Sequence, residues 1–351
     1  MRGSGGQDVC PWDLREEESE DEEDWLFSSV RQYQQLHMFQ LSVSPSHLAL
    51  SPDGHHLALA DSGRGQLEVY RLPGKLVAAS EEEEGLTSNR DFALVCGTVK
   101  CPAVRSLHCV GRRRLVTTSS DCQAVSVWRW EAGEDLLERT GEVSTGQFQP
   151  RAVEVLGQDR LLVWGENWLA RADMEGRGLD RREVGGGGGG EIQTVMTEAS
   201  VTWYLDTRGD LSSLDWRQSD SVLHHNIHQG RKDRSLSQSC FFKRGSNTFL
   251  AGHGDQTLSL WDLRNCQPVQ EVSLASPGAH IVTDSEGNIV LSQGSRVSLY
   301  SSDSLQLVFS HETHRADISC LLAHPAVRNL VISADSNSRL QAWVHNSPAL
   351  T

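Results

Sequence analysis

The chain has 351 residues and a mass of 38.8 kDa, enough for one large all-β domain or two smaller domains. Its mean hydropathy is -0.41, and the lack of any run of about 18 apolar residues excludes a membrane-spanning helix. The net charge of -15 disfavours a nucleic-acid-binding protein, which normally presents a basic face. The eight cysteines form no C-x-x-C pair, so we expect free thiols.

The N-terminal segment, residues 1–23, is rich in glycine and acids, so we expect it to be disordered. It lacks the apolar segment of a secretory signal, which predicts a location in the cytosol or nucleus. In residues 24–36 apolar side chains recur at the spacing of one helical face. This predicts a short amphipathic helix that packs against the folded domain. The alternative is that this segment binds a partner protein, through Trp25, Leu26, Val30 and Tyr33.

Residues 238–264 show most clearly the unit that the rest of the chain repeats. Two apolar strands lead to a tight turn at Gly254–Asp255, and a third strand then alternates apolar and polar residues before it ends in Trp261 and Asp262. Period-two alternation between such turns predicts β-strands. The Trp–Asp ending is the signature of a WD-repeat propeller blade.

Seven copies of this unit follow one another along the chain. Their third strands end at Tyr70, Trp128, Arg171, Trp216, Trp261, Tyr300 and Trp343. Most of the spacings lie near the blade period of ~40–45 residues. The longer first spacing contains residues 73–90, which we interpret as an acidic inserted loop around Glu81–Glu84, and residues 185–190 form a glycine loop.

Each copy except the last is followed by a candidate fourth strand. Too few residues follow Trp343 for another strand, so we expect residues 37–43 to supply it and to close the ring without an open edge. The sequence therefore predicts an all-β fold, a seven-bladed WD-repeat β-propeller over residues 24–351. An N-terminal strand closes it, and a short N-terminal helix precedes that strand.

No nucleophile, phosphate-binding or metalloprotease motif is present, so we predict no catalytic residues, no cofactor and no metal. His224, His225 and His228 alternate along an outer strand and make a poor zinc site. The alternative is a propeller hydrolase with its site at the channel mouth. Its candidate acids lie in different blades and share no motif: Asp61, Asp121, Asp206 and Asp284.

Two basic clusters lie at predicted turns, at Arg112–Arg114 and at Arg231, Lys232 and Arg234. We interpret them as solvated turn charge. They could instead contact an acidic partner or the acidic N-terminus of the chain itself. A third alternative function is RNA binding through these clusters, with an affinity that falls steeply with salt, and the net negative charge argues against it.

Blade seven carries a set of residues that points to a stabilising hydrogen-bond network. His314, Ser333 and Trp343 stand where WD-repeat blades place a His–Ser–Trp chain, and Asn337 takes the position of the usual Asp. In blade five only Asp255 and Trp261 match, because Ala251 occupies the Ser position. We expect these residues to be structural, since a buried polar network fixes the geometry of a blade.

Two stretches resemble the WD repeat-containing protein 73 family: EDWLFSSVRQYQQLHMFQL from Glu23 to Leu41, and NLVISADSNSRLQAW from Asn329 to Trp343. The resemblance implies a non-enzymatic scaffold or assembly factor that binds other proteins. It implies an association with the RNA-cleaving module of the Integrator complex and its endonuclease subunits, and with tubulin, microtubules and the spindle. It also implies a cytoplasmic location with a nuclear share. We expect the chain itself to be monomeric and to bind neither nucleic acid nor membrane directly.

Overall fold

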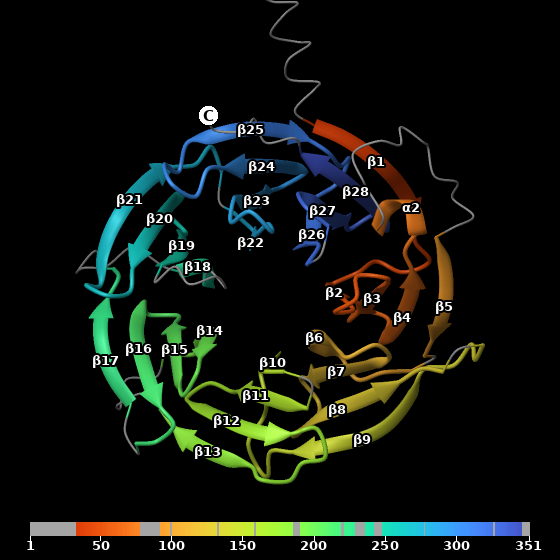
Figure 1. Cartoon of the computed structure of the whole chain (residues 1–351), viewed down its shortest axis with the longest axis horizontal. Coiled ribbons are helices and arrows are strands. Elements are labelled where there is room, and N and C mark those ends of the chain that lie inside the picture. The colour runs from red at the N-terminus through yellow and green to blue at the C-terminus, as the bar shows by residue number, and fades with distance from the viewer. Residues whose placement is uncertain are drawn as a thin grey trace, which may run out of the picture.

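The computed structural model of the chain describes residues 33–77, 92–98, 100–131, 133–157, 159–184, 190–218, 221–228, 236–241, 248–276, 278–325 and 327–345. These residues form seven four-stranded antiparallel sheets that stand side by side in a ring (Figure 1). The predicted all-β, seven-bladed propeller is therefore confirmed. No helix in the described part of the chain has the length and apolar character to cross a membrane.

Each blade has an inner strand nearest the centre of the ring and a second strand beside it (Figure 1). The inner strands, from blade 1 to blade 7, are β2 (His47–Leu50), β6 (Val104–Val110), β10 (Ala152–Val155), β14 (Ile192–Glu198), β18 (Leu236–Phe241), β22 (His280–Thr283) and β26 (Ile318–Ala323). The second strands are β3 (His56–Asp61), β7 (Arg114–Ser119), β11 (Arg160–Trp164), β15 (Val201–Asp206), β19 (Thr248–His253), β23 (Ile289–Gln293) and β27 (Leu330–Asp335).

The third and fourth strands complete each blade toward the rim. The third strands are β4 (Gln66–Arg71), β8 (Ala124–Arg129), β12 (Trp168–Asp173), β16 (Asp210–Asp215), β20 (Thr257–Asp262), β24 (Arg296–Tyr300) and β28 (Arg339–His345). The fourth strands are β5 (Ala93–Gly97), β9 (Glu138–Ser144), β13 (Asp180–Glu183), β17 (Ser221–Asn226), β21 (Gln267–Ser273), β25 (Leu307–Glu312) and, for blade 7, β1 (Tyr33–Gln40).

The N-terminal strand closes the ring, as predicted, by pairing antiparallel with β28. Its bounds differ from the prediction, because β1 runs over Tyr33–Gln40 and not over residues 37–43. The predicted helix over residues 24–36 is therefore wrong at 33–36, and residues 24–32 lie outside the described residues. The edge of β28 offers backbone partners to these positions, as in the pairing of Tyr33 with His345, whereas a short isolated helix is only marginally stable.

The insertion after blade 1 begins with one helical turn, α2 (Gly74–Val77), within the predicted loop 73–90. The acidic residues Glu81–Glu84 lie outside the described residues, as do residues 185–189 of the glycine loop. The six cysteines with described side chains form no disulfide.

The hydrophobic core is divided into seven clusters, one at each junction between neighbouring blades. A central strand packs against a neighbouring blade on both of its faces, so both faces must be apolar. On β3, for example, Leu57, Ala58, Leu59 and Ala60 are all fully buried. This arrangement explains why the second strands are apolar runs and do not alternate.

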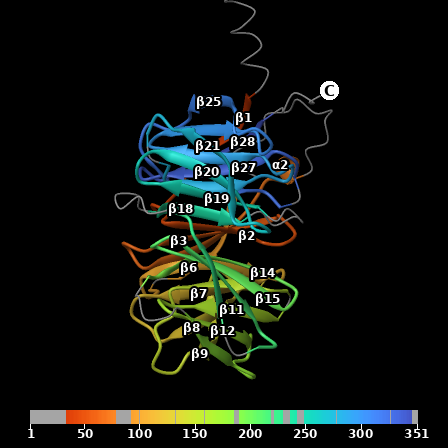
Figure 2. The same cartoon turned by 90° about the vertical axis from the view of Figure 1, so that its left-hand side faces the viewer.

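Antiparallel connectivity gives the ring two different faces (Figure 2). One face carries the turns between second and third strands and the connectors between blades, and we name it the connector face. The other carries the connections from first to second and from third to fourth strands, and we name it the hairpin face.

His324 joins blade 7 to blade 1 in its neutral form. Its Nδ1 accepts a hydrogen bond from the Val327 amide at 2.8 Å, and its Nε2 donates to the Gly54 carbonyl at 3.1 Å. Gly54 has a φ of 73° and lies directly against the imidazole, so a side chain there would collide with the ring. Burial lowers the pKa of His324 below its ordinary value of 6.5.

We expect the free energy of unfolding to fall as the pH drops below about 6.5, because the unfolded chain then binds protons that buried His324 does not. The loss should be about 1–2 kcal/mol between pH 7 and 5.5. Urea unfolding across this range measures it. The variant His324→Gln should make the slope shallower without removing it, because burial also lowers the pKa of His47, His280 and His314; His311→Gln, at an exposed position, is the control and should keep the slope of the unmodified chain. Equal slopes in both variants would contradict this assignment.

Candidate protein-binding surface

A groove of about 780 Å³ opens on the connector face where blades 2, 3 and 4 meet, and we name it the connector groove. Four separate segments line it: the start of β6 with Arg105, the connector from blade 2 to blade 3, the turn between β11 and β12, and the connector that leads into β14. It is the junction of three blades, so side chains far apart in the sequence share one surface.

Aromatic side chains form one wall of the connector groove. The ring of Phe148 lies edge-on to Trp168 with centroids 6.1 Å apart, and the Arg181 guanidinium lies over Phe148 at 3.4 Å from its centroid. Gly165 allows this packing, because a Cβ there would meet the Trp168 indole and would lie 2.9 Å from the Gln149 carbonyl oxygen. Phe148 and Trp168 are thus fixed by contacts with each other, with Arg181 and with the backbone, so this wall is in place without a bound partner.

The other wall is polar and equally well held. The guanidinium of Arg151 forms an ion pair with Glu191, while the Arg151 amide donates to the Trp164 carbonyl at 2.7 Å. The amide of Ile192 donates to the Glu166 carbonyl at 3.0 Å. Gln149 and Glu166 have exposed side chains that can hydrogen-bond a partner.

The described lining contains no serine, cysteine, histidine or lysine, and its acids are Glu166 and Glu191, of which Glu191 is paired with Arg151. A groove with aromatic and paired polar walls is suited to contact with a protein surface.

Part of the predicted network in blade 7 forms: His314 and Ser333 are joined, the acid is a different one, and Trp343 is placed by packing. His314 Nδ1 donates to Asp335 Oδ2 at 3.1 Å, and Ser333 Oγ donates to His314 Nε2 at 2.8 Å, so the acid is Asp335 and not Asn337. Asn337 lies in the following turn, where its amide donates to Asp335 Oδ1 at 2.9 Å. Trp343 is fully buried, edge-on to Phe309. Burial lowers the pKa of His314, in keeping with a neutral ring between two partners.

Blade 5 uses a different chain of hydrogen bonds from the predicted one. Trp261 Nε1 donates to Ser259 Oγ at 2.8 Å, and Ser259 lies 2.8 Å from His253 Nε2. Asp255 does not join them, because its carboxylate accepts from the Thr257 hydroxyl at 2.6 Å and caps the turn. A buried indole N–H needs a hydrogen-bond acceptor. A tryptophan at the end of a third strand therefore indicates that a hydroxyl side chain lies nearby.

The same need is met by threonines in two other blades. Trp128 donates to Thr117 at 2.9 Å, and Trp216 donates to Thr202 at 2.8 Å.

The arm residues predicted to bind a partner are only partly described. Trp25, Leu26 and Val30 lie outside the described residues, and Tyr33 is described through its backbone, which pairs with His345 in the closing strand. The role of the arm therefore stays a prediction.

The three histidines of β17 and its end do not converge. His224 lies 2.7 Å from Ser213 Oγ and packs on Trp203, His225 packs near Trp261, and His228 packs near His253. In the part of the chain that the structure describes, no three His, Cys, Asp or Glu side chains are grouped to hold a metal ion.

The four acids considered for a channel-mouth hydrolase are also separate. Asp206 and Asp284 each accept two backbone amides of their own turns, and Asp61 accepts the Arg64 amide at 2.9 Å. Asp121 accepts the Ser120 hydroxyl at 2.9 Å. Asp284 follows an inner strand and so lies on the hairpin face, whereas the other three follow second strands on the connector face. Their geometry is that of turn caps.

The closed ring, the Trp261–Asp262 ending of β20 and the His–Ser–Asp network together define a seven-bladed β-propeller of the WD-repeat type. No family model matches the chain. A segment of 111 residues, 31% of this chain, is 27% identical to the Integrator complex assembly factor WDR73 of Danio rerio. The matched segment covers 29% of that relative's length.

Proposed function

We propose that the chain is a non-catalytic scaffold on which other proteins assemble, and that it acts in assembly of the Integrator complex. The connector groove is the observation that supports the scaffold role, because its aromatic and polar walls are held by neighbouring residues and offer a surface to a protein partner. The partial match to an assembly factor of that complex supports the choice of partner.

The resemblance of the N-terminal and C-terminal stretches extends the proposal. It favours the endonuclease subunits of the RNA-cleaving module as direct partners, with tubulin and the spindle as a second association. It also favours a cytoplasmic location with a nuclear share. Imaging of the tagged chain in dividing cells tests the location and the spindle association together.

The connector groove can be tested by capture of partners from cells. The double variant Glu166→Lys, Asn167→Lys reverses the charge at an exposed part of the groove rim. It should lower recovery of Integrator subunits at least about tenfold, which corresponds to ~1.4 kcal/mol. Quantitative mass spectrometry measures the recovery.

The matched control is Glu175→Lys, Leu179→Lys, which makes the same charge change at exposed positions on the hairpin face of the same blade. It should capture partners as the unmodified chain does. Equal recovery with both variants would argue against the groove. A chain lacking residues 1–32, which keeps β1 and with it Tyr33, tests the rest of the arm: loss of partners on this truncation alone would assign recognition to Trp25, Leu26 and Val30.

A further inference from the structure

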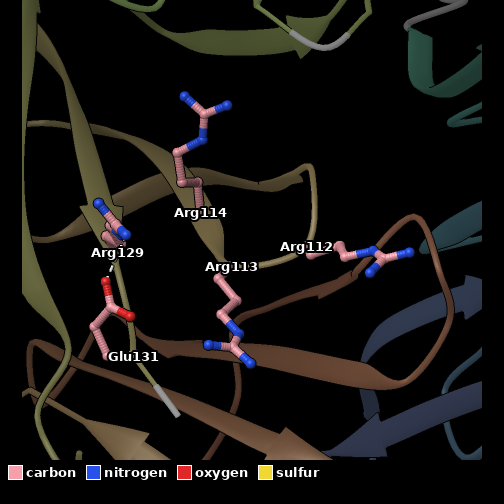
Figure 3. A pocket seen from close by; sticks show the side chains of 5 residues that line it. All are labelled: Arg112, Arg113, Arg114, Arg129 and Glu131. Atoms are coloured by element: carbon pink, nitrogen blue, oxygen red, sulfur yellow. Dashed lines mark ion pairs between the residues drawn. The ribbon is translucent and has the colours of Figure 1, made fainter.

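The hairpin face carries a second surface, which we name the arginine hollow. It lies on blade 2, on the face of the ring opposite to the connector groove. Arg112 and Arg113 lie in the turn between β6 and β7, Arg114 begins β7, and Arg129 ends β8. With Glu131 they line a hollow of about 510 Å³ (Figure 3). Four guanidinium groups thus share one open site in a chain whose net charge is -15.

Among the described residues, two of these arginines are neutralised by neighbours. Arg114 lies 3.2 Å from Asp159, and Arg129 lies 2.5 Å from Glu131. Arg112 and Arg113 are exposed, and among the described side chains no carboxylate lies within the 4.0 Å of an ion pair to either one. The hollow therefore presents two free guanidinium groups to a ligand.

The positive surface continues onto blade 1. Arg71 ends β4 with an exposed side chain, and the charges of Arg71 and Arg113 both affect the pKa of His56. Burial is the largest cause that lowers the pKa of His56; the carboxylate of Asp53 opposes this shift, and the two arginines lower the pKa further. The ring of His56 packs against Trp130, with centroids 5.8 Å apart. The surface therefore spans two blades on a rigid base.

The directions of the side chains indicate the shape of the ligand. In Figure 3 the guanidinium groups of Arg112, Arg113 and Arg114 point away from one another. Side chains that point apart are suited to an extended chain with repeated anionic groups, which can meet several of them in turn. The planar fork of arginine matches a carboxylate in bidentate geometry.

A polypeptide fits this surface better than a nucleic acid does. Glu131 and Asp159 lie within and beside the hollow, and they would repel the continuous phosphates of a backbone that crosses it. The carboxylates of a peptide can be spaced to avoid them. We propose that the arginine hollow binds an extended acidic segment of a partner protein. Because the hollow and the connector groove lie on opposite faces, two partners can be bound at once.

The test is direct binding to the purified full-length chain. The probe is a fluorescein-labelled peptide of about ten residues that alternates glutamate and serine, long enough to cross the hollow at ~3.3 Å per residue. The variant Arg112→Glu, Arg113→Glu should weaken binding at least tenfold and keep the melting temperature, since both side chains are exposed. The control Arg177→Glu, Arg217→Glu makes the same charge change at exposed, ion-paired arginines and should bind within about threefold of the unmodified chain.

Four results would overturn the proposal. The unmodified chain does not bind the peptide, or both double variants lose binding equally, so that only net charge matters. A single-stranded RNA of equal charge binds more tightly than the peptide. Replacement of Glu81–Glu84 by glutamine raises the affinity for the peptide, which would make the chain's own acidic loop the occupant. The assay contains no Integrator subunit, so its failure is distinct from failure of the groove experiment.

Discussion

Replacement of Phe39 by alanine is expected to lower the free energy of unfolding by about 3–5 kcal/mol. Phe39 lies on the closing strand β1 and is only 3% exposed. Its ring stacks on Phe92 at 4.2 Å, and Phe92 in turn stacks on Tyr70 at 4.7 Å. The substitution therefore leaves a cavity in the aromatic stack that connects the last blade to the first. Urea unfolding followed by tryptophan fluorescence measures the loss.

Met38 provides the matched control on the same strand. Its side chain is 52% exposed, so Met38→Ala should change stability by no more than about 0.5 kcal/mol. A similar loss in both variants would mean that pairing of β1, and not burial of the ring, stabilises the closure. A chain lacking residues 1–40 separates these causes further, because it removes the strand itself and exposes the edge of β28.

Closure was predictable from the sequence because it follows from counting strands. Blade 7 needs a fourth strand, and residues 37–43 are a strand-like segment that no other blade uses. The exact bounds were not predictable, since Tyr33 continues the helical spacing of the residues before it and residues 33–36 show no strand-like alternation. The backbone of β28 decides between them, and that partner lies about three hundred residues away, as the pairing of Tyr33 with His345 shows.

The blade networks were predictable in kind but not residue by residue. Sequence spacing places Asn337 at the acidic position, yet Asp335, the last residue of β27, reaches His314. In blade 5 the hydroxyl comes from Ser259 on the third strand, because Ala251 on the second strand has none. The N–H of a buried indole or imidazole needs a hydrogen-bond acceptor, but the register of the strands decides which neighbouring side chain provides it.

The two candidate surfaces differ in how far the sequence reveals them. The sequence reveals the arginine hollow as the cluster Arg112–Arg114. Which of its arginines form ion pairs depends on where Asp159 and Glu131 lie, and only the structure shows that. The connector groove leaves no local pattern, since Phe148, Trp168 and Glu191 come from three segments that only the ring brings together. A surface built at a blade junction therefore needs the structure, whereas a charged turn does not.

Replacement of Asp335 by alanine is expected to lower the free energy of unfolding by about 3–5 kcal/mol, because it leaves several buried donors without an acceptor. Asp335 is fully buried, and it accepts from His314 Nδ1 and from the amides of Asn337 and Arg339, both at 2.9 Å. One carboxylate therefore anchors the imidazole and the turn that leads into β28. Denaturant unfolding at pH 7.5, where His314 is neutral, measures the effect.

Two further variants show which of these bonds matters. Asp335→Asn keeps an oxygen for the turn amides and loses the bond from His314, so it should cost about 1–3 kcal/mol. Asp255→Ala, at the exposed turn cap of blade 5, should cost less than about 1 kcal/mol, since water can replace the lost acceptor. If the costs of Asp335→Ala and His314→Ala simply add in the double variant, the two residues act independently. A double variant little worse than Asp335→Ala alone would show that they form one network, and that blade 7 depends on it to hold the strand with which β1 pairs.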